Sequence, residues 1–209
     1  MTEILSEIFS TILQIGTFTL IPFIFFLLRK DKSISFRQYI GLYKPPTKSI
    51  FYVLFVSLLF VVIGIGMTFI DSGIKQAVLT PPSITGKLRL MGLNTNTIII
   101  ILIIALLKTS FAEEILFRGF IAKRLIKKFN FKIGNILQAL IFGIIHFILF
   151  YALSKSTILP ILFIFAFSTF AGWIIGYIKE KYANGSIIPG WIAHGLGNVI
   201  SYVVIAFVI

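Results

Sequence analysis

Two adjacent glutamates and two histidines are the residues of this chain whose types and spacing are best suited to chemistry. Glu113 and Glu114 lie near the end of an apolar run, and the two histidines of the sequence, His146 and His194, lie within later apolar runs. Both side-chain types can take up or release protons, and an ionised group inside an apolar segment is costly without a partner. Together these residues predict a functional site within the apolar part of the protein.

The spacing of the charged residues assigns different roles to the two glutamates. Arg118 follows Glu114 by four residues, so in a helix the two side chains share a face and can neutralise each other. Glu113 points about 100° away around the helix and has no cation three or four residues from it. We therefore expect Glu114 and Arg118 to form a structural pair and Glu113 to be the functional carboxylate.

The composition shows that these residues lie in a membrane protein. The 209-residue chain is 58% hydrophobic and 12% charged, with a mean hydropathy of +1.03, which is too apolar for a soluble domain. Its net charge of +12 comes from lysines and arginines that cluster between apolar runs, as is typical of membrane topology. We expect the lipid bilayer as a partner and no nucleic acid. Cysteine is absent, which excludes a thiol nucleophile and disulfides.

Six apolar runs are long enough to cross a bilayer, which needs about 20 residues. The first has no basic residue before it and is too long for a signal peptide, so we expect it to remain as a spanning helix. The prediction is an all-α fold, with residues 1–209 forming one integral membrane domain. This domain is a polytopic helical bundle of about six transmembrane helices with an intramembrane active site. The runs cover residues 4–28, 49–70, 97–120, 133–153, 158–178 and 188–209.

Basic residues mark one side of this bundle. The first, third and fifth connections contain 13 lysines and arginines, against 4 in the second and fourth. The odd connections are therefore predicted to be cytoplasmic and both termini to lie outside. Counting about 1.5 Å per residue from the cytoplasmic ends places Glu113, His146 and His194 roughly 10 to 20 Å into the membrane. We expect them to share one layer that water reaches from the cytoplasm.

Two neighbours of the histidines point to the same layer. Asn198 follows His194 by four residues, and Phe142 precedes His146 by four and would form a wall of the site. Either histidine alone could instead be a hydrogen-bond donor between helices. Four glycines of the last two spans are expected to let helices approach closely: Gly172, Gly176, Gly195 and Gly197.

Lys108 is a charged residue without a local explanation. It is expected near the middle of the third span, and neither Glu113 nor Glu114 shares its helix face. It has to snorkel, line a wet cavity or find a partner on another helix.

Three motifs in this order resemble the CPBP family of intramembrane proteases: Glu113-Glu114-x-x-x-Arg118, Phe142-x-x-x-His146 and His194-x-x-x-Asn198. That family contains the CAAX prenyl endopeptidases and bacterial members linked to bacteriocin processing and self-immunity. The similarity covers about residues 105–202 and includes the flanking runs Phe117-Arg118-Gly119 and Asn184-Gly185-Ser186-Ile187. It implies a peptidase in the cell membrane of a prokaryote that acts on a membrane-associated peptide or protein.

The resemblance also implies site roles. Glu113 would be the general base, His146 would hold the water, and His194 with Asn198 would face the oxyanion. Glu114, Arg118 and Phe142 would support them. A prenylated CAAX substrate and a bacteriocin or pheromone leader both remain open.

A metal is the alternative to a free glutamate base. Glu113, His146 and His194 together are the ligand set of a hydrolytic zinc site with one open position. If all three bound a single zinc ion, another base would be needed, and Glu114 is already paired with Arg118. We favour a glutamate-activated water without a cofactor.

Two other functions use the same residues. A small transporter could relay protons through this layer, although such transporters show paired halves or broken helices, which this sequence lacks. A non-catalytic partner, such as a bacteriocin-immunity or regulatory membrane protein, would keep its phenotype after Glu113→Ala.

Overall fold

The computed structural model describes residues 2–29, 33–153 and 156–209, and its regular elements in these ranges are all helices. The predicted all-α fold is confirmed. Lys30, Lys32 and Lys155, which entered the count of basic residues, lie outside the described residues. In chain order the elements are α1 (Thr2–Leu27), α2 (Phe36–Ile40), α3 (Ser49–Ile70), α4 (Ser72–Leu79), α5 (Ile84–Met91), α6 (Thr95–Leu102), η1 (Ile103–Phe111), η2 (Glu114–Ala122), α7 (Lys123–Phe129), α8 (Phe131–Leu153), α9 (Ile158–Lys181) and α10 (Ile188–Phe207).

Five of these helices, α1, α3, α8, α9 and α10, are long and apolar enough to cross a membrane. They coincide with five of the six predicted spans, and α3 has the predicted bounds. α9 continues to Lys181, three residues beyond the predicted end. Length and hydropathy therefore located these spans to within a few residues.

The remaining predicted span, the third, is helical without a break from Thr95 to Phe129 but changes its type along the way. η1 and η2 are π-helices, whose i→i+5 bonds widen the turn and often mark functional sites. Two backbone oxygens of η1 accept hydrogen bonds from side chains of other helices. Trp191 Nε1 donates to Leu106 O at 2.6 Å, and Gln14 Nε2 donates to Lys108 O at 2.8 Å. Such insertions into the helical ladder come from tertiary contacts and have no counterpart in the hydropathy pattern.

The second connection, which includes Pro81-Pro82, contains the short helices α4 and α5. Each begins at a capping side chain that accepts a backbone N–H. Asp71 Oδ1 accepts from Ile74 N at 2.9 Å, and Ser83 Oγ accepts from Gly86 N at 3.0 Å. The irregular backbone of this connection lies mainly at residues 80–83, between the two helices, and at residues 92–94, before α6.

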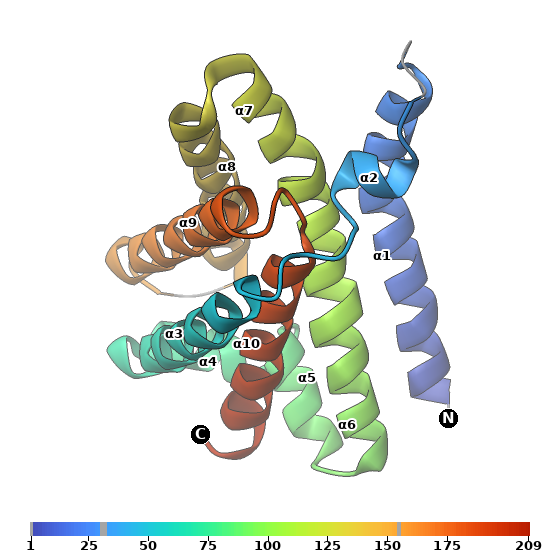
Figure 1. Cartoon of the computed structure of the whole chain (residues 1–209). Helices are drawn as coiled ribbons and strands as arrows, with labels where there is room; N and C mark the ends of the chain where they lie inside the picture. Colours follow the sequence, from blue (N-terminus) through green and yellow to red (C-terminus); the bar gives the residue numbers. More distant parts are fainter. Residues whose placement is uncertain (1, 30–32, 154–155) are drawn as a thin grey trace.

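The two ends of the bundle differ in charge and in the elements that they carry. α2 and α7, which belong to the lysine- and arginine-rich connections, lie at one end, which we name the basic end (Figure 1). Both chain termini and the turn from α5 to α6 lie at the opposite end (Figure 1). Both termini on one side agree with an even number of crossings.

Close helix packing in the bundle uses the glycines identified in the sequence. A Cβ atom would come within 3.3 Å of α8 at Gly172 and Gly176, of η1 at Gly195 and of α3 at Gly197. Helix α1, by contrast, lies at the edge of the bundle and contacts mainly η1 and η2 (Figure 1). Most of its apolar side chains face outward, as expected for a helix against lipid.

Candidate active site

One cavity inside the bundle contains all four residues predicted to be catalytic. The cavity has a volume of about 590 Å³, and its lining includes Glu113, His146, His194 and Asn198. These side chains come from the third, fourth and sixth predicted spans, which meet here with α3 and α9. The structure brings the four residues together, and their catalytic roles stay predictions.

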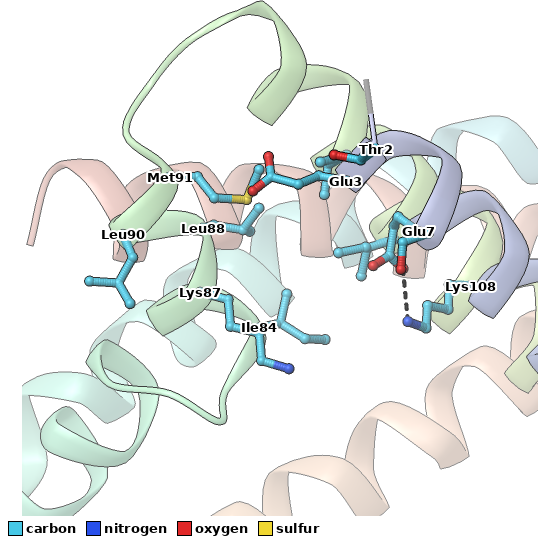
Figure 2. A pocket seen from close by; sticks show the side chains of 12 residues that line it. Thr2, Glu3, Glu7, Ile84, Lys87, Leu88, Leu90, Met91 and Lys108 are labelled. Carbon is cyan, nitrogen blue, oxygen red and sulfur yellow. Dashed lines mark hydrogen bonds and ion pairs between the residues drawn. The ribbon is translucent and has the colours of Figure 1, made fainter.

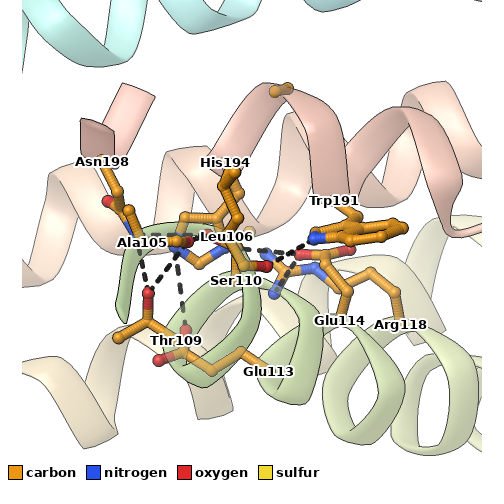
Figure 3. Close-up of polar contacts among 12 residues, drawn as sticks. Ala105, Leu106, Thr109, Ser110, Glu113, Glu114, Arg118, Trp191, His194 and Asn198 are labelled. Carbon is orange, nitrogen blue, oxygen red and sulfur yellow. Dashed lines mark hydrogen bonds and ion pairs between the residues drawn. The ribbon is translucent and has the colours of Figure 1, made fainter. Parts of the chain in front are cut away.

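His194 lies between the two glutamates. Its Nε2 is 3.9 Å from Glu113 Oε2, and its Nδ1 is 3.7 Å from Glu114 Oε1 (Figure 3). Both separations exceed a direct hydrogen bond and leave room for a bridging water or a small shift. A protonated imidazole donates from both nitrogens, so this ring can address both carboxylates at once.

His146 is oriented by its own helix. Its Nδ1 is 2.9 Å from Phe142 O, one turn earlier in α8. A carbonyl oxygen can only accept, so we assign the proton to Nδ1. This tautomer leaves the Nε2 lone pair of His146 free to accept a hydrogen bond from a water in the cavity.

Phe142 forms the wall that the sequence predicted. Its ring centroid is 4.3 Å from the ring of His146 and 6.3 Å from the ring of His194. On its other side the guanidinium carbon of Arg118 lies 4.3 Å from the Phe142 centroid, a cation–π contact. Phe142 therefore contacts both imidazole rings and the buried Arg118 guanidinium.

Glu114 and Arg118 form the predicted buried ion pair. Arg118 Nη1 is 3.1 Å from Glu114 Oε1, and both side chains are 0% exposed. The atoms are within ion-pairing distance, although no aligned hydrogen bond joins them. Gly190, which the sequence analysis did not single out, lies against this pair, because a Cβ there would be 2.7 Å from Glu114 Oε2. The sequence indicated Gly190 only through its position near the start of the sixth predicted span.

Asn198 differs from its predicted surroundings. Its amide nitrogen donates to Thr109 Oγ1 at 3.1 Å and to Ser110 Oγ at 3.3 Å (Figure 3). Both amide hydrogens therefore have acceptors on η1. The hydroxyls of Thr109 and Ser110 were missed, because their contact with Asn198 depends on how η1 and α10 meet.

The zinc ligand set considered for this site does not assemble in the described part of the chain. Within residues 2–29, 33–153 and 156–209, no group of three or more His, Asp or Glu side chains is placed to hold a metal ion. Glu113 and His194 approach each other, but His146 directs Nδ1 to its own backbone. The chemistry below is therefore derived from the side chains alone.

Lys108 has its partners on α1. Its Nζ is 2.7 Å from Glu7 Oε1 (Figure 2). The same Nζ donates to Ser10 Oγ at 2.9 Å, and the backbone oxygen of Lys108 accepts from Gln14. The side chain lines both the catalytic cavity and a second cavity of about 550 Å³ beside the start of α1. Of the three explanations that the sequence left open, a partner on another helix holds, and the side chain also borders the two cavities.

We expect Lys108→Leu to be folded and to change the cleavage rate at most several-fold. The ion pair with Glu7 fastens α1 to η1 but is partly exposed, so its contribution to stability is small, on the order of 1 kcal/mol. Cleavage by purified protein is the measurement, with Glu7→Gln as the matched control because it removes the same pair from the other side. Complete inactivation by Lys108→Leu alone would show that Lys108 has a catalytic role.

The cavity does not extend toward the basic end, where we expected water to enter. From the layer of Glu113 and His194 it continues in the opposite direction, to the turn between α4 and α5, where Ser83 and Thr85 line it. Toward the basic end the neighbouring side chains are tightly packed, Glu114 and Arg118 among them. We expected the cavity to open toward the basic connections, but it runs in the opposite direction.

Comparison with known protein families assigns this site to a group. Residues 95–200, just over half of the chain, match the family model described as type II CAAX prenyl endopeptidase Rce1-like. The matched region contains all three motifs and agrees with the range of about 105–202 expected from the resemblance. No curated protein and no solved structure matches the chain. With residues of all three motifs lining one cavity of the bundle and this match over them, the chain belongs to the Rce1-like family of type II CAAX prenyl endopeptidases.

Proposed function

We propose that this protein is an intramembrane endopeptidase in which Glu113 activates the water that hydrolyses a peptide bond. The observation that carries the proposal is the state of this carboxylate. Glu113 Oε2 lies in the cavity wall, lacks a hydrogen-bond partner among the described residues, and is 3.9 Å from His194 Nε2. A buried carboxylate oxygen without a hydrogen-bond partner costs folding free energy inside an apolar bundle, so its presence points to a functional role.

The reaction can be written with these side chains. Glu113 takes a proton from the water while the water oxygen bonds to the carbonyl carbon of the substrate, which gives a tetrahedral oxyanion. When this intermediate collapses, the carbon–nitrogen bond breaks and the proton passes from Glu113 to the leaving nitrogen. The products are a carboxylic acid and an amine, and Glu113 is again ionised.

The histidines and Asn198 provide the hydrogen bonds that this sequence of steps needs. His146 Nε2 accepts from the water and orients its lone pair, because Nδ1 is held by Phe142 O. His194 donates to the oxyanion from Nε2 while Nδ1 faces Glu114. Asn198 supplies a second donor when the substrate oxygen replaces Ser110, the more distant of its two acceptors.

The substrate is a membrane-associated peptide or protein of the CAAX type or of the bacteriocin or pheromone-leader type. To identify it, peptides in the membrane and medium of cells that carry the wild-type protein are compared with those of cells that carry Glu113→Gln. A precursor that accumulates uncut in the variant, and whose cut form is present in the wild type, identifies the substrate. Identical peptide profiles in the two strains would contradict the proposal.

We place the protein in the cell membrane of a prokaryote, with the basic end in the cytoplasm. Because the chain has no cysteine, single cysteines report the side of each position without background. Cysteines at Lys44 and Lys128 should be shielded from an impermeant thiol reagent in intact cells, and one at Lys87 should react. All three side chains are exposed, so accessibility depends on the side of the membrane. Labelling at position 128 from outside would reverse the orientation.

We expect activity without bound zinc. The measurement is the metal content of detergent-purified, active protein, followed by titration with a chelator. The expected results are well below one zinc per chain and a rate that the chelator does not change. Close to one zinc per chain, lost together with activity and restored by added zinc, would instead make Glu113, His146 and His194 ligands.

A further inference from the structure

We infer that the substrate enters this active site from the end of the bundle opposite the basic end, so that the protein cleaves peptides presented at the outer face of the membrane. The inference deepens the proposed function and rests on it, because it assumes that a peptide substrate is cleaved at Glu113. It stands on three observations: the direction of the cavity, the packing on its other side, and the bonding between two connections at the basic end.

The cavity lies mainly in one half of the bundle. On α3 and α8 the lining residues come only from the half that lies away from the basic connections, whereas α9 and α10 also contribute residues nearer the basic end, Ile175 on α9 and His194 on α10. The lining residues run from Phe60 to Thr68 on α3, from Phe142 to Leu153 on α8, from Ile164 to Ile175 on α9 and from His194 to Ile205 on α10. Because α9 runs antiparallel to the others, its first half lies on the same side as their second halves.

The turn between α4 and α5 forms the far end of the cavity. Pro82, Ser83 and Thr85 line it there, with Ile74 and Val78 of α4 beside them. These residues belong to the second connection, which holds three of the 19 lysines and arginines. The wall between this turn and the catalytic layer is mostly apolar, which suits an extended peptide or a lipid-like group.

Between the catalytic layer and the basic end the side chains of the bundle are tightly packed. The side chains between Glu113 and the basic end include the largest fully buried ones of the described chain. Their exposed fractions are below 2%: Glu114, Arg118, Gln138, Lys179 and Ile187. Lys179, which the sequence placed in an exposed connection, is 1% exposed and pairs with the neighbouring Glu180. A buried and paired charge network of this kind leaves no channel for a peptide.

Two connections close the basic end over this packing. Ile187 N donates to Gly41 O at 2.9 Å, and Tyr43 Oη donates to Asn184 O at 2.7 Å. Burial, and then the charge of Glu180, raise the pKa of Tyr43, which keeps the hydroxyl protonated and able to donate. Gly41 has a φ of 82°, and a Cβ there would lie 2.5 Å from Gly185 O, so the contact requires a glycine.

The entrance determines the class of substrate. With the basic end in the cytoplasm, the open half of the bundle faces the outer half of the bilayer. A peptide bond can then reach Glu113 from an exported peptide or from a membrane segment cut near its outer end. Of the two proposed substrate types, a CAAX terminus that stays in the cytoplasm meets the packed side and does not fit this entrance, whereas an exported bacteriocin or pheromone leader does.

The test uses three single cysteines and a charged thiol reagent. Ser201→Cys lies in the open half of the cavity, about 9 Å from the end of α10. Ser57→Cys is its matched control, because Ser57 is 5% exposed, is not among the lining residues, and lies on α3 between the basic end and the cavity. Lys87→Cys, which lies in the second connection, defines the side. Labelling rates are compared in right-side-out and inside-out membrane vesicles.

We expect Ser201→Cys to react at least tenfold faster in the vesicle orientation in which Lys87→Cys reacts, and Ser57→Cys to react in neither. Faster reaction of Ser201→Cys in the other orientation would overturn the inference. If Ser201→Cys reacted with the charged reagent in neither orientation, the inference would also be overturned, since the entrance would then lie in lipid. Labelling needs no turnover, so a protein that showed the expected pattern but cut no peptide would contradict the proposed function and leave the entrance in place.

Discussion

Replacing Glu113 by glutamine should lower the rate of peptide cleavage by about 10²–10⁴-fold, the usual contribution of a general base. Glutamine keeps the size and one oxygen of the side chain but cannot take a proton from water. The free carboxylate oxygen in the cavity and its 3.9 Å separation from His194 Nε2 are the reasons for this expectation. Initial rates of cleavage by detergent-purified protein are the measurement.

Folding should be unaffected by this change, because Glu113 has no buried ion-pair partner on its own helix. Elution as a single species and an unchanged thermal transition will show that the loss is chemical. Glu3→Gln is the matched control, since Glu3 is an exposed carboxylate that does not line the cavity of Glu113. A Glu113→Gln protein that cuts within tenfold of the wild-type rate would remove Glu113 from the chemistry.

Arg118→Ala should have the largest effect on stability. Both members of the pair with Glu114 are 0% exposed, and removing one leaves an uncompensated charge inside the bundle. The cost is on the order of 3 to 5 kcal/mol. Lost contact of the guanidinium with the Phe142 ring adds to it. We expect much less folded protein, measured as the yield of a monodisperse species in detergent.

The double variant Glu114→Gln with Arg118→Gln separates charge from chemistry. Removing both charges should recover part of the folded protein, because no unpaired ion of this pair remains. Its cleavage rate should stay below the wild-type rate, since His194 Nδ1 loses the carboxylate that lies 3.7 Å away. Full expression of Arg118→Ala with no cleavage would contradict a structural role and place Arg118 in catalysis or substrate binding.

The spans could be predicted because hydropathy is a local property. An apolar run of sufficient length has one stable outcome in a bilayer, a helix that satisfies its own backbone. The prediction failed where neighbours alter that helix. η1 and η2 are wider than an α-helix, and side chains such as Trp191 and Gln14 bond to carbonyls of η1 from other parts of the chain.

The candidate site was predictable for a related reason. A bundle this apolar has few polar groups, and helical spacing alone fixes that Glu114 meets Arg118 and that Phe142 meets His146. The order of these motifs then identified the family. Spacing could not reveal the contact of Gly190 with Glu114 or the bonds of Asn198 to the η1 hydroxyls, because these depend on how two helices are rotated against each other.

The sequence by itself determined the class of protein, five of the spanning helices, the pairing of Glu114 with Arg118 and the residues that face one another along a single helix. The tertiary structure decided which helices meet and at what depth. Lys108 shows the difference, since its partner Glu7 is 101 residues away and no local pattern connects them. The direction of the cavity is a second case. Charge in the connections orients the chain, but packing density within each half of the bundle, a property of all the helices together, decides on which side of Glu113 there is space.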